Sequence, residues 1–432
     1  MMKRASLLLA LAAALLPAAS AQNMFRGNTA HTGVYDTEGP KQLKGLKWAF
    51  KTGGPVVSSP TVIGGVAYVG SDDMIMHAVD VATGKEKWQF KTGGIVRSTP
   101  AVAEGAVYFG SYDGVFYALD AASGQLKWKF AAPGERKFEA KGLHGYLPRT
   151  QTIPDFWDLY LSSPAIADGV VYFGSGDGNC YALDAATGQL KWKFETKGVV
   201  HSSPAVVNGA VYFGSWDTYL YAVGAKSGQE KWKFKTGEDA VNYNQTGIQS
   251  SPAVVDGVVY FGCRDSNFYA VDAATGQEKW KYKSTWVNAS AAVRDGSVYF
   301  GTSIPAFFIA LDASTGKERY KFAAHTPVFS SPALAGGLAY FGSFNGSLYA
   351  VNLKDGKLTW EFQTDAAKKN APAYLKPDGS LNFATVFTSN SFEDMYQASG
   401  KLFSLGAIVS TPVVDHGVVY VGSADGNLYA LE

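Results

Sequence analysis

Short runs of apolar and aromatic residues recur along almost the whole chain, and glycine-containing turns separate them. Residues 162–194, SSPAIADGVVYFGSGDGNCYALDAATGQLKWKF, give the pattern once in full. Runs such as VVYFG and NCYALD are too short for helices and rich in strand-forming residues, and Asp-Gly between two runs favours a hairpin. Each unit therefore predicts four antiparallel strands joined by three tight turns.

The uninterrupted spacing between units is 40 residues, measured on the proline of a recurring Ser-Ser-Pro or Ser-Thr-Pro motif. These prolines are Pro60, Pro100, Pro164, Pro204, Pro252, Pro332 and Pro412, and Ala291 stands in for one more. A four-stranded repeat of about 40 residues has the length of a propeller blade. The sequence thus predicts an all-β fold, an eight-bladed β-propeller of four-stranded antiparallel blades.

The chain begins and ends with incomplete units. Residues 45–53, GLKWAFKTG, match only the closing strand of a unit, whereas residues 410–432 supply its first three strands and stop. Unpaired strand edges and an open apolar face would be unfavourable. We therefore predict that the N-terminal strand pairs with the C-terminal blade and closes the ring.

Residues 364–408 allow a second count. Pro372 lies 40 residues from both Pro332 and Pro412, as the proline of a ninth blade would. The surrounding sequence nevertheless has no YFGS, no ALDAATG and no tryptophan strand, and Ser391–Asp394 (SFED) is typical of a helix N-terminus. The segment is predicted to be an insertion, and the ring to have eight blades.

Eight aromatic residues occupy equivalent positions in the closing strands of the units. They are Trp48, Trp88, Trp128, Trp192, Trp232, Trp280, Tyr320 and Trp360. Burying such a ring contributes on the order of 2–3 kcal/mol, so a structural role between neighbouring blades is expected. The Asp of ALDAATG is expected to shape its turn, and its replacement by Gly224 in one unit argues against catalysis.

The first residues have the features of a secretory signal peptide. Lys3-Arg4 precedes an apolar run over residues 7–16, and ASA at residues 19–21 resembles a cleavage site. The predicted divisions are a signal peptide at 1–21, a lead-in at 22–43 and the propeller at 44–432. The protein is accordingly expected to be periplasmic or secreted.

Composition excludes several classes of function. The 38 Lys and Arg residues nearly balance the 37 Asp and Glu residues, so no nucleic-acid partner is expected. No stretch after the leader is predicted to span a membrane. The two cysteines, Cys180 and Cys263, lie in units that are not neighbours and are expected to be buried thiols. No spacing of His, Cys and carboxylates suggests a metal site, and a monomer is expected.

Three insertions, at residues 131–161, 236–249 and 364–408, interrupt the repeat between blades. In a meander of four strands, the connections between blades emerge on the same face as the GSxDG turns. All three insertions are therefore expected on one face. Long loops on one rim of a rigid scaffold are where binding sites are usually built.

Residues that depart from the repeat at this rim are the candidate ligand contacts. They lie just before the Ser-Pro motif, in the GSxD turns or in the first insertion: Arg97, Tyr112, His201, Trp216, Gln249, Arg264, Asn288, Trp286, Arg149 and Trp157. Cations, an imidazole and flat rings suit a planar, anionic or polyhydroxylated ligand. The alternative is that they are ordinary turn and rim residues, since such positions tolerate most side chains.

The unit GSxDGxLYALDAATGxxKWxF resembles the repeat of pyrroloquinoline-quinone-like (quinoprotein-type) β-propellers, over essentially all of residues 44–432. The resemblance implies an eight-bladed ring in which the closing-strand aromatic docks onto the next blade. It also implies mixed activities, because some members are quinone-dependent alcohol or sugar dehydrogenases. Others have no cofactor, such as the lipoprotein of the outer-membrane barrel assembly machinery.

The alcohol-oxidising members carry adjacent cysteines and a tryptophan beneath the quinone, and this chain has neither at the matching positions. We therefore expect the exported non-enzymatic branch of the family: a binding or scaffold protein with no catalytic residue and no cofactor. Its partner on the loop-rich face would be a protein, peptide or carbohydrate. The alternative is a dehydrogenase that binds pyrroloquinoline quinone and Ca²⁺.

Overall fold

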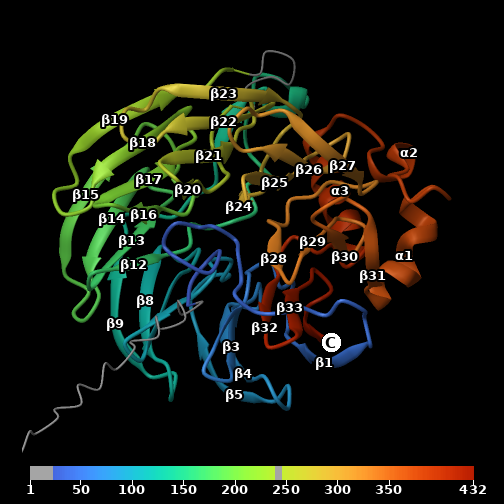
Figure 1. The fold of residues 1–432 in the computed structure, drawn as a ribbon, viewed down its shortest axis with the longest axis horizontal. Helices are drawn as coiled ribbons and strands as arrows, with labels where there is room; N and C mark the ends of the chain where they lie inside the picture. The colour runs from blue at the N-terminus through green and yellow to red at the C-terminus, as the bar shows by residue number, and fades with distance from the viewer. Residues whose placement is uncertain (1–22, 239–245) are drawn as a thin grey trace, which may run out of the picture.

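The structure is a computed structural model, and it describes residues 23–238 and 246–432. The predicted signal peptide, residues 1–21, lies outside the described residues. Eight four-stranded antiparallel sheets succeed one another around a central axis (Figure 1), and this confirms the predicted eight-bladed propeller. In this part of the chain helix is confined to one short turn and to the last insertion.

Each of the first seven blades is one continuous meander in which the first strand is innermost. Blade 1 has β2 (Thr61–Ile63), β3 (Val66–Gly70), β4 (Ile75–Asp80) and β5 (Glu86–Lys91). Blade 2 has β6 (Ala101–Ala103), β7 (Ala106–Gly110), β8 (Val115–Asp120) and β9 (Leu126–Ala131). Blade 3 has β12 (Ala165–Ala167), β13 (Val170–Gly174), β14 (Asn179–Asp184) and β15 (Leu190–Glu195). Blade 4 has β16 (Ala205–Val207), β17 (Ala210–Gly214), β18 (Tyr219–Gly224) and β19 (Glu230–Lys235).

The second half of the ring follows the same plan. Blade 5 has β20 (Ala253–Val255), β21 (Val258–Gly262), β22 (Asn267–Asp272) and β23 (Glu278–Lys283). Blade 6 has β24 (Ala292–Arg294), β25 (Ser297–Gly301), β26 (Phe307–Asp312) and β27 (Glu318–Ala323). Blade 7 has β28 (Ala333–Ala335), β29 (Leu338–Gly342), β30 (Ser347–Asn352) and β31 (Leu358–Gln363). Blade 8 joins β32 (Val413–Asp415), β33 (Val418–Gly422) and β34 (Asn427–Leu431) to β1 (Leu46–Lys51).

The two ends of the chain close the ring as predicted. Strand β1 pairs antiparallel with β34, with Trp48 opposite Ala430 and Phe50 opposite Leu428. Figure 1 shows β1 beside the C-terminus. The backbone N–H groups of residues 44 and 45 also donate to the carbonyl of Glu432, at 2.6 and 3.0 Å. The ladder groups that each incomplete unit would expose are thereby paired.

Two serines of the Ser-Ser-Pro motif connect the innermost strands of successive blades. The hydroxyl of Ser162 donates to the carbonyl of Ser202 in the next blade at 3.0 Å. The N–H of Ser163 donates to the hydroxyl of Ser203 at 2.9 Å. Similar pairs recur around the axis, so this motif holds blades together and has no need of a chemical role.

The closing-strand aromatics dock on the following blade. The indole N–H of Trp128 donates to the carbonyl of Ala185 at 3.0 Å, and its ring lies against Gly188 of the next ALDAATG turn. A Cβ on Gly188, whose φ is +72°, would come within 2.6 Å of that ring. Trp360 has no such turn ahead of it in blade 8, and it donates instead to the carbonyl of Pro40 at 2.7 Å.

Residues 23–35 of the lead-in, named here the plug, run across the innermost strands at the end of the axis that carries the Asp-Gly turns. Their carbonyls accept hydrogen bonds from inner-strand N–H groups, such as those of Val206 and Val254, at 2.7 and 2.9 Å. The buried Arg26 guanidinium donates to the carbonyls of Ala291 and Pro332. This contact of residues 23–35 with the inner strands was not predicted from the sequence.

The insertions follow the fourth strand of one blade and precede the first strand of the next. Residues 132–161, named here the cap, contain β10 (Glu139–Lys141), a 3₁₀ turn at Leu143–Gly145 and β11 (Thr152–Pro154). Residues 364–408, named here the helical insertion, form α1 (Asp365–Tyr374), α2 (Phe383–Val386) and α3 (Phe392–Ser404), with Ser391 capping α3 as expected. Of the insertion at 236–249, residues 239–245 lie outside the described part.

Candidate functional site

The cap covers the end of the axis opposite the plug. The hydroxyl of Tyr160 donates to the carbonyls of Val409 and Phe329, at 3.0 and 3.2 Å, across the mouth of the ring. The carbonyl of Leu159 accepts from Arg97 at 3.2 Å. An axial cavity of about 30 Å³ remains between the cap and Phe25 of the plug. The channel mouth, where the ligand was predicted, is thus filled by the chain itself.

His201 anchors the cap through two carboxylates. Its Nδ1 lies 2.8 Å from Asp158, and its Nε2 lies 2.8 Å from Glu135. Burial alone would lower the pKa of His201, but the two carboxylates outweigh burial and raise this pKa to about 10. The ring is therefore an imidazolium that carries the positive charge of a fully buried ion cluster.

Arg264 is the second anchor, and its side chain is fully buried. It forms an ion pair with Asp155 of the cap and donates to the carbonyl of Trp157 at 2.9 Å. Its guanidinium lies between two indoles, 4.5 Å from the Trp216 ring centroid and 5.4 Å from that of Trp286. Burial would raise the pKa of Asp155, but Arg264 and His144 outweigh it and hold this pKa well below its usual range.

Other predicted contacts join the same cluster. Gln249 donates to Asp158 at 3.1 Å and accepts from Arg264 at 3.0 Å, and the Asn288 carbonyl oxygen accepts from Arg264 at 3.2 Å. Trp216 stacks on Phe138 of the cap, with the ring centroids 4.3 Å apart. The indole N–H of Trp216 and the amide nitrogen of Asn288 are buried without a hydrogen-bond partner.

Three predicted residues lie apart from this cluster. Arg97 forms a bidentate pair with Asp72 at 2.6 and 2.8 Å, and this pair raises the pKa of Arg97 against the lowering effect of burial. Tyr112 contacts the His201 ring edge-on at 6.3 Å, and its buried hydroxyl has no partner. Arg149 is exposed at the tip of the cap. As ligand contacts, all ten residues remain predictions.

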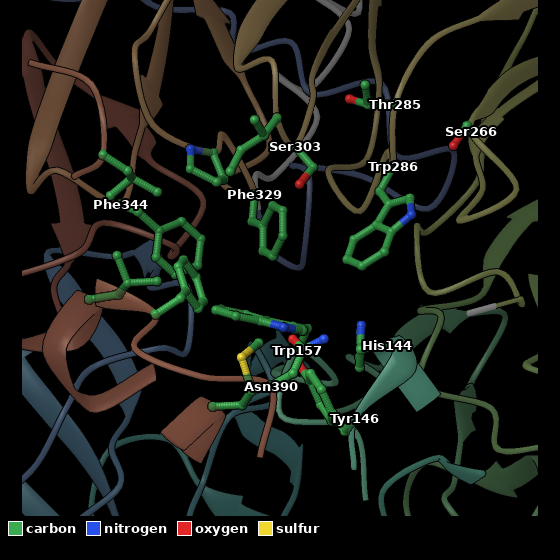
Figure 2. A pocket seen from close by; sticks show the side chains of 16 residues that line it. His144, Tyr146, Trp157, Ser266, Thr285, Trp286, Ser303, Phe329, Phe344 and Asn390 are labelled. Atoms are coloured by element: carbon green, nitrogen blue, oxygen red, sulfur yellow. The ribbon is translucent and has the colours of Figure 1, made fainter. Parts of the chain in front are cut away.

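An apolar pocket of about 310 Å³ lies beside the capped axis, between the cap, the rim of blades 5 to 7 and the helical insertion. Figure 2 shows Trp157 and Tyr146 of the cap on one side and Trp286 and Phe329 of the rim on the other. The helical insertion adds Leu381, Phe387, Met395 and Leu402 to the wall. Trp157 and Trp286 were predicted from sequence, whereas the contribution of the helical insertion was not.

The pocket wall combines apolar residues with a few polar groups. Its lining has no Asp, Glu, Lys or Arg, and its histidine, His144, is held by Asp155 at 2.9 Å. The hydroxyls of Tyr146 and Thr285 are both buried: that of Thr285 has no hydrogen-bond partner, and the O–H of Tyr146 has no acceptor, although the Trp157 indole lies beside it. Unpaired buried hydroxyls are costly, so each is a position where a bound molecule or water would be favoured.

The cap and the helical insertion are joined directly. The N–H of Leu147 donates to the carbonyl of Asn390 at 3.0 Å, and Leu147 forms a parallel bridge with Ser391. Phe156 packs against Phe392 with ring centroids 4.8 Å apart. The two insertions therefore form one continuous structure over this end of the ring, named here the insertion face.

The capped end of the axis is a poor fit for a redox quinone. The axial cavity of about 30 Å³ is far smaller than a three-ring cofactor. The rim carboxylates Asp72, Asp155 and Asp158 are engaged by Arg97, Arg264 and His201. In the part of the chain that the structure describes, no group of three or more His, Cys, Asp or Glu residues could hold a metal ion. Nor does any described helix have the length and apolarity to cross a membrane.

The family model described as outer membrane protein assembly factor BamB matches residues 36–142, 155–286 and 283–432. No curated protein matches the chain. Among solved structures, BamB from Moraxella catarrhalis is 15% identical with a TM-score of 0.64, covering 90% of this chain and 97% of that one.

Two dehydrogenases share the architecture as well. A europium-containing methanol dehydrogenase is 16% identical with a TM-score of 0.68, covering 94% of this chain and 91% of that one. The quinohemoprotein alcohol dehydrogenase from Comamonas testosteroni is 15% identical with a TM-score of 0.68, covering 95% and 80%. At such identities these likenesses show the fold alone.

Proposed function

The chain belongs to the family described as outer membrane protein assembly factor BamB, and on that premise we propose that it is an exported, non-catalytic binding protein. It would act in the periplasm and hold a protein partner on its insertion face, in outer-membrane protein assembly. The observation that carries this proposal is the insertion face itself, where two insertions together with the rim enclose the apolar pocket.

The charges of the rim support a binding role over a catalytic one. His201 and Arg264 are fully buried, and both are paired with carboxylates of the cap. A general base or a substrate-binding cation must reach the reacting molecule. These side chains instead fix the shape of the insertion face.

Deletion of the protein from its producing cell tests the assembly role. We expect folded outer-membrane β-barrels, measured by heat-modifiable gel mobility, to decrease and to be restored by the wild-type protein. Ile304→Asp combined with Phe383→Asp places charges at exposed positions of the blade 6 rim and the insertion face, and this variant is expected not to restore the folded β-barrels. Leu126→Asp with Leu190→Asp is the matched control, because those exposed leucines lie at the outer edge of blades 2 and 3. Full restoration by the insertion-face variant would contradict the proposal.

The dehydrogenase hypothesis is tested separately. Titration with pyrroloquinoline quinone and Ca²⁺ is expected to give no saturable binding and no dye-linked oxidation of alcohols or sugars. Binding at one site with turnover would replace the scaffold proposal by the enzymatic one.

A further inference from the structure

The apolar pocket has the features of a site for one particular kind of side chain. Most of its wall is aromatic or aliphatic, and it lies between facing rings of the cap and the rim (Figure 2). Its volume of about 310 Å³ accommodates one large side chain with part of its backbone. Aromatic rings favour offset-stacked or edge-on contact with other rings, so such a wall prefers a flat occupant.

The charges around the pocket further limit which kind of side chain it is able to bind. The wall contains no ionised Asp, Glu, Lys or Arg, and the carboxylate nearest to its histidine, that of Asp155, is paired with Arg264. A charged occupant would lose its hydration without gaining a counter-ion. The pocket therefore favours an uncharged ring.

Two hydroxyls of the pocket wall favour an occupant whose ring carries a polar group. Tyr146 is only 2% exposed, and its hydroxyl belongs to the pocket wall, where the Trp157 indole lies beside it but its O–H has no acceptor. The hydroxyl of Thr285 is likewise buried and unpaired. Each is able to donate or accept, so an O–H or N–H group on the occupant would satisfy them.

The surroundings of the opening indicate that this ring is carried by a polypeptide. Ile304 in the pocket wall is 44% exposed, and Phe383, which stacks on the wall residue Phe387, is 48% exposed. Leu147, which hydrogen-bonds the wall residue Asn390, is 57% exposed. These three apolar side chains come from three separate segments, each of which contributes to the pocket wall or contacts a residue of it. A free small molecule would leave them in water, whereas residues flanking an anchor would cover them.

We propose that the pocket receives a tyrosine or tryptophan side chain from an apolar segment of the partner protein, with the hydroxyls of Tyr146 and Thr285 bonding its O–H or N–H group. This inference rests on the proposed function, because it identifies what part of a partner the insertion face recognises.

The first test uses the intact protein and defined probes. Isothermal titration is expected to detect N-acetyltyrosinamide and N-acetyltryptophanamide but not N-acetylleucinamide or maltose. Tyr146→Phe and Thr285→Val remove the unpaired hydroxyls with little change in shape, and each is expected to weaken binding about tenfold while leaving the melting temperature unchanged. Tyr172→Phe is the matched control: its hydroxyl donates to the carbonyl of Ala225 at 3.2 Å, so its loss should lower stability and spare binding.

The second test addresses the polypeptide. The peptide Ac-Ala-Leu-Tyr-Leu-Ala-NH₂ is expected to bind at least about tenfold more tightly than N-acetyltyrosinamide, because its leucines cover the apolar rim. Ile304→Ser should reduce that difference without affecting the single amide. Equal affinity of peptide and amide, binding of maltose, or unchanged affinity in both hydroxyl variants would each overturn the proposal. Outer-membrane assembly in cells is a separate measurement, so this proposal can fail while the proposed function stands.

Discussion

The buried imidazolium of His201 makes the stability of the cap depend on pH. Its pKa is raised to about 10 in the folded protein, against about 6.5 in an unfolded chain. A group whose pKa is raised by folding contributes all of its stabilisation below the unfolded pKa and loses it as the pH rises through the folded pKa. The contribution of His201 should therefore be complete below about pH 6.5 and disappear by about pH 10.

The magnitude follows from the same values. At 1.36 kcal/mol for each tenfold change in proton affinity, a pKa of about 10 corresponds to a contribution on the order of 5 kcal/mol. Solvent does not screen this interaction and so does not reduce the contribution, since the side chains of His201 and Asp158 are fully buried. We expect His201→Gln to lower the free energy of unfolding by about this amount at pH 6, because it leaves two buried carboxylates without a cation.

Urea unfolding from pH 6 to pH 10.5 measures the effect. The difference between wild type and His201→Gln should shrink by about 1.4 kcal/mol for each pH unit above 6.5. Tyr and Lys titration affects both proteins equally and cancels. Trp216 stacks on Phe138 of the cap, so its fluorescence reports cap release at the same time.

A second histidine provides the control. His77 lies between Asp73 and Glu86 at 3.1 and 2.7 Å, within blade 1 and away from the cap. Here too burial lowers the pKa, but the carboxylates outweigh burial and raise it. His77→Gln should reduce stability yet leave protease resistance of residues 132–161 intact. If the gap between wild type and His201→Gln stays constant from pH 6 to pH 10.5, His201 is not a buried cation and the reasoning fails.

Further substitutions test the blade contacts and the cap. Gly176→Ala would place a Cβ about 2.2 Å from the Glu135 carboxylate and 2.3 Å from the Arg136 carbonyl. The cap would have to shift, so trypsin should cleave residues 132–161 faster than in the wild type. An unchanged cleavage rate would show that the cap is anchored elsewhere. Trp128→Ala removes a docked ring and should cost about 3–5 kcal/mol in urea unfolding, and a loss below about 1 kcal/mol would contradict the docking role. Burial raises the pKa of Cys180 and Cys263, so neither should react with a thiol reagent such as DTNB until the protein unfolds, whereas rapid labelling of the native protein would show that the thiols are accessible.

The repeat made the ring predictable because each part of it depends on neighbouring residues. Short apolar and aromatic runs determine the strands, Asp-Gly determines the hairpins, and a spacing of 40 residues determines the blade. The docking of Trp128 on Gly188 then repeats a contact between sequence-adjacent units. The closure of the ring could be predicted by counting the closing and the opening strands in the sequence.

The insertion face was less predictable, because its contacts join distant segments without a repeating pattern. Departure from the consensus singled out His201 and Arg264 as ligand contacts, which stays a prediction, but their partners Asp158 and Asp155 lie 43 and 109 residues away. Nothing local to either residue distinguishes a contact with an insertion from a contact with a ligand. The plug was missed for the same reason, since its carbonyls bond N–H groups from blades 4 and 5.

The plug and the cap also determine what the ring is unable to do. Between Phe25 of the plug and Tyr160 of the cap, the axis keeps a cavity of only about 30 Å³, room for one or two water molecules. No polypeptide strand or solute is able to pass along the axis of the propeller. Molecules that move past the protein therefore have to pass around the outside of the ring.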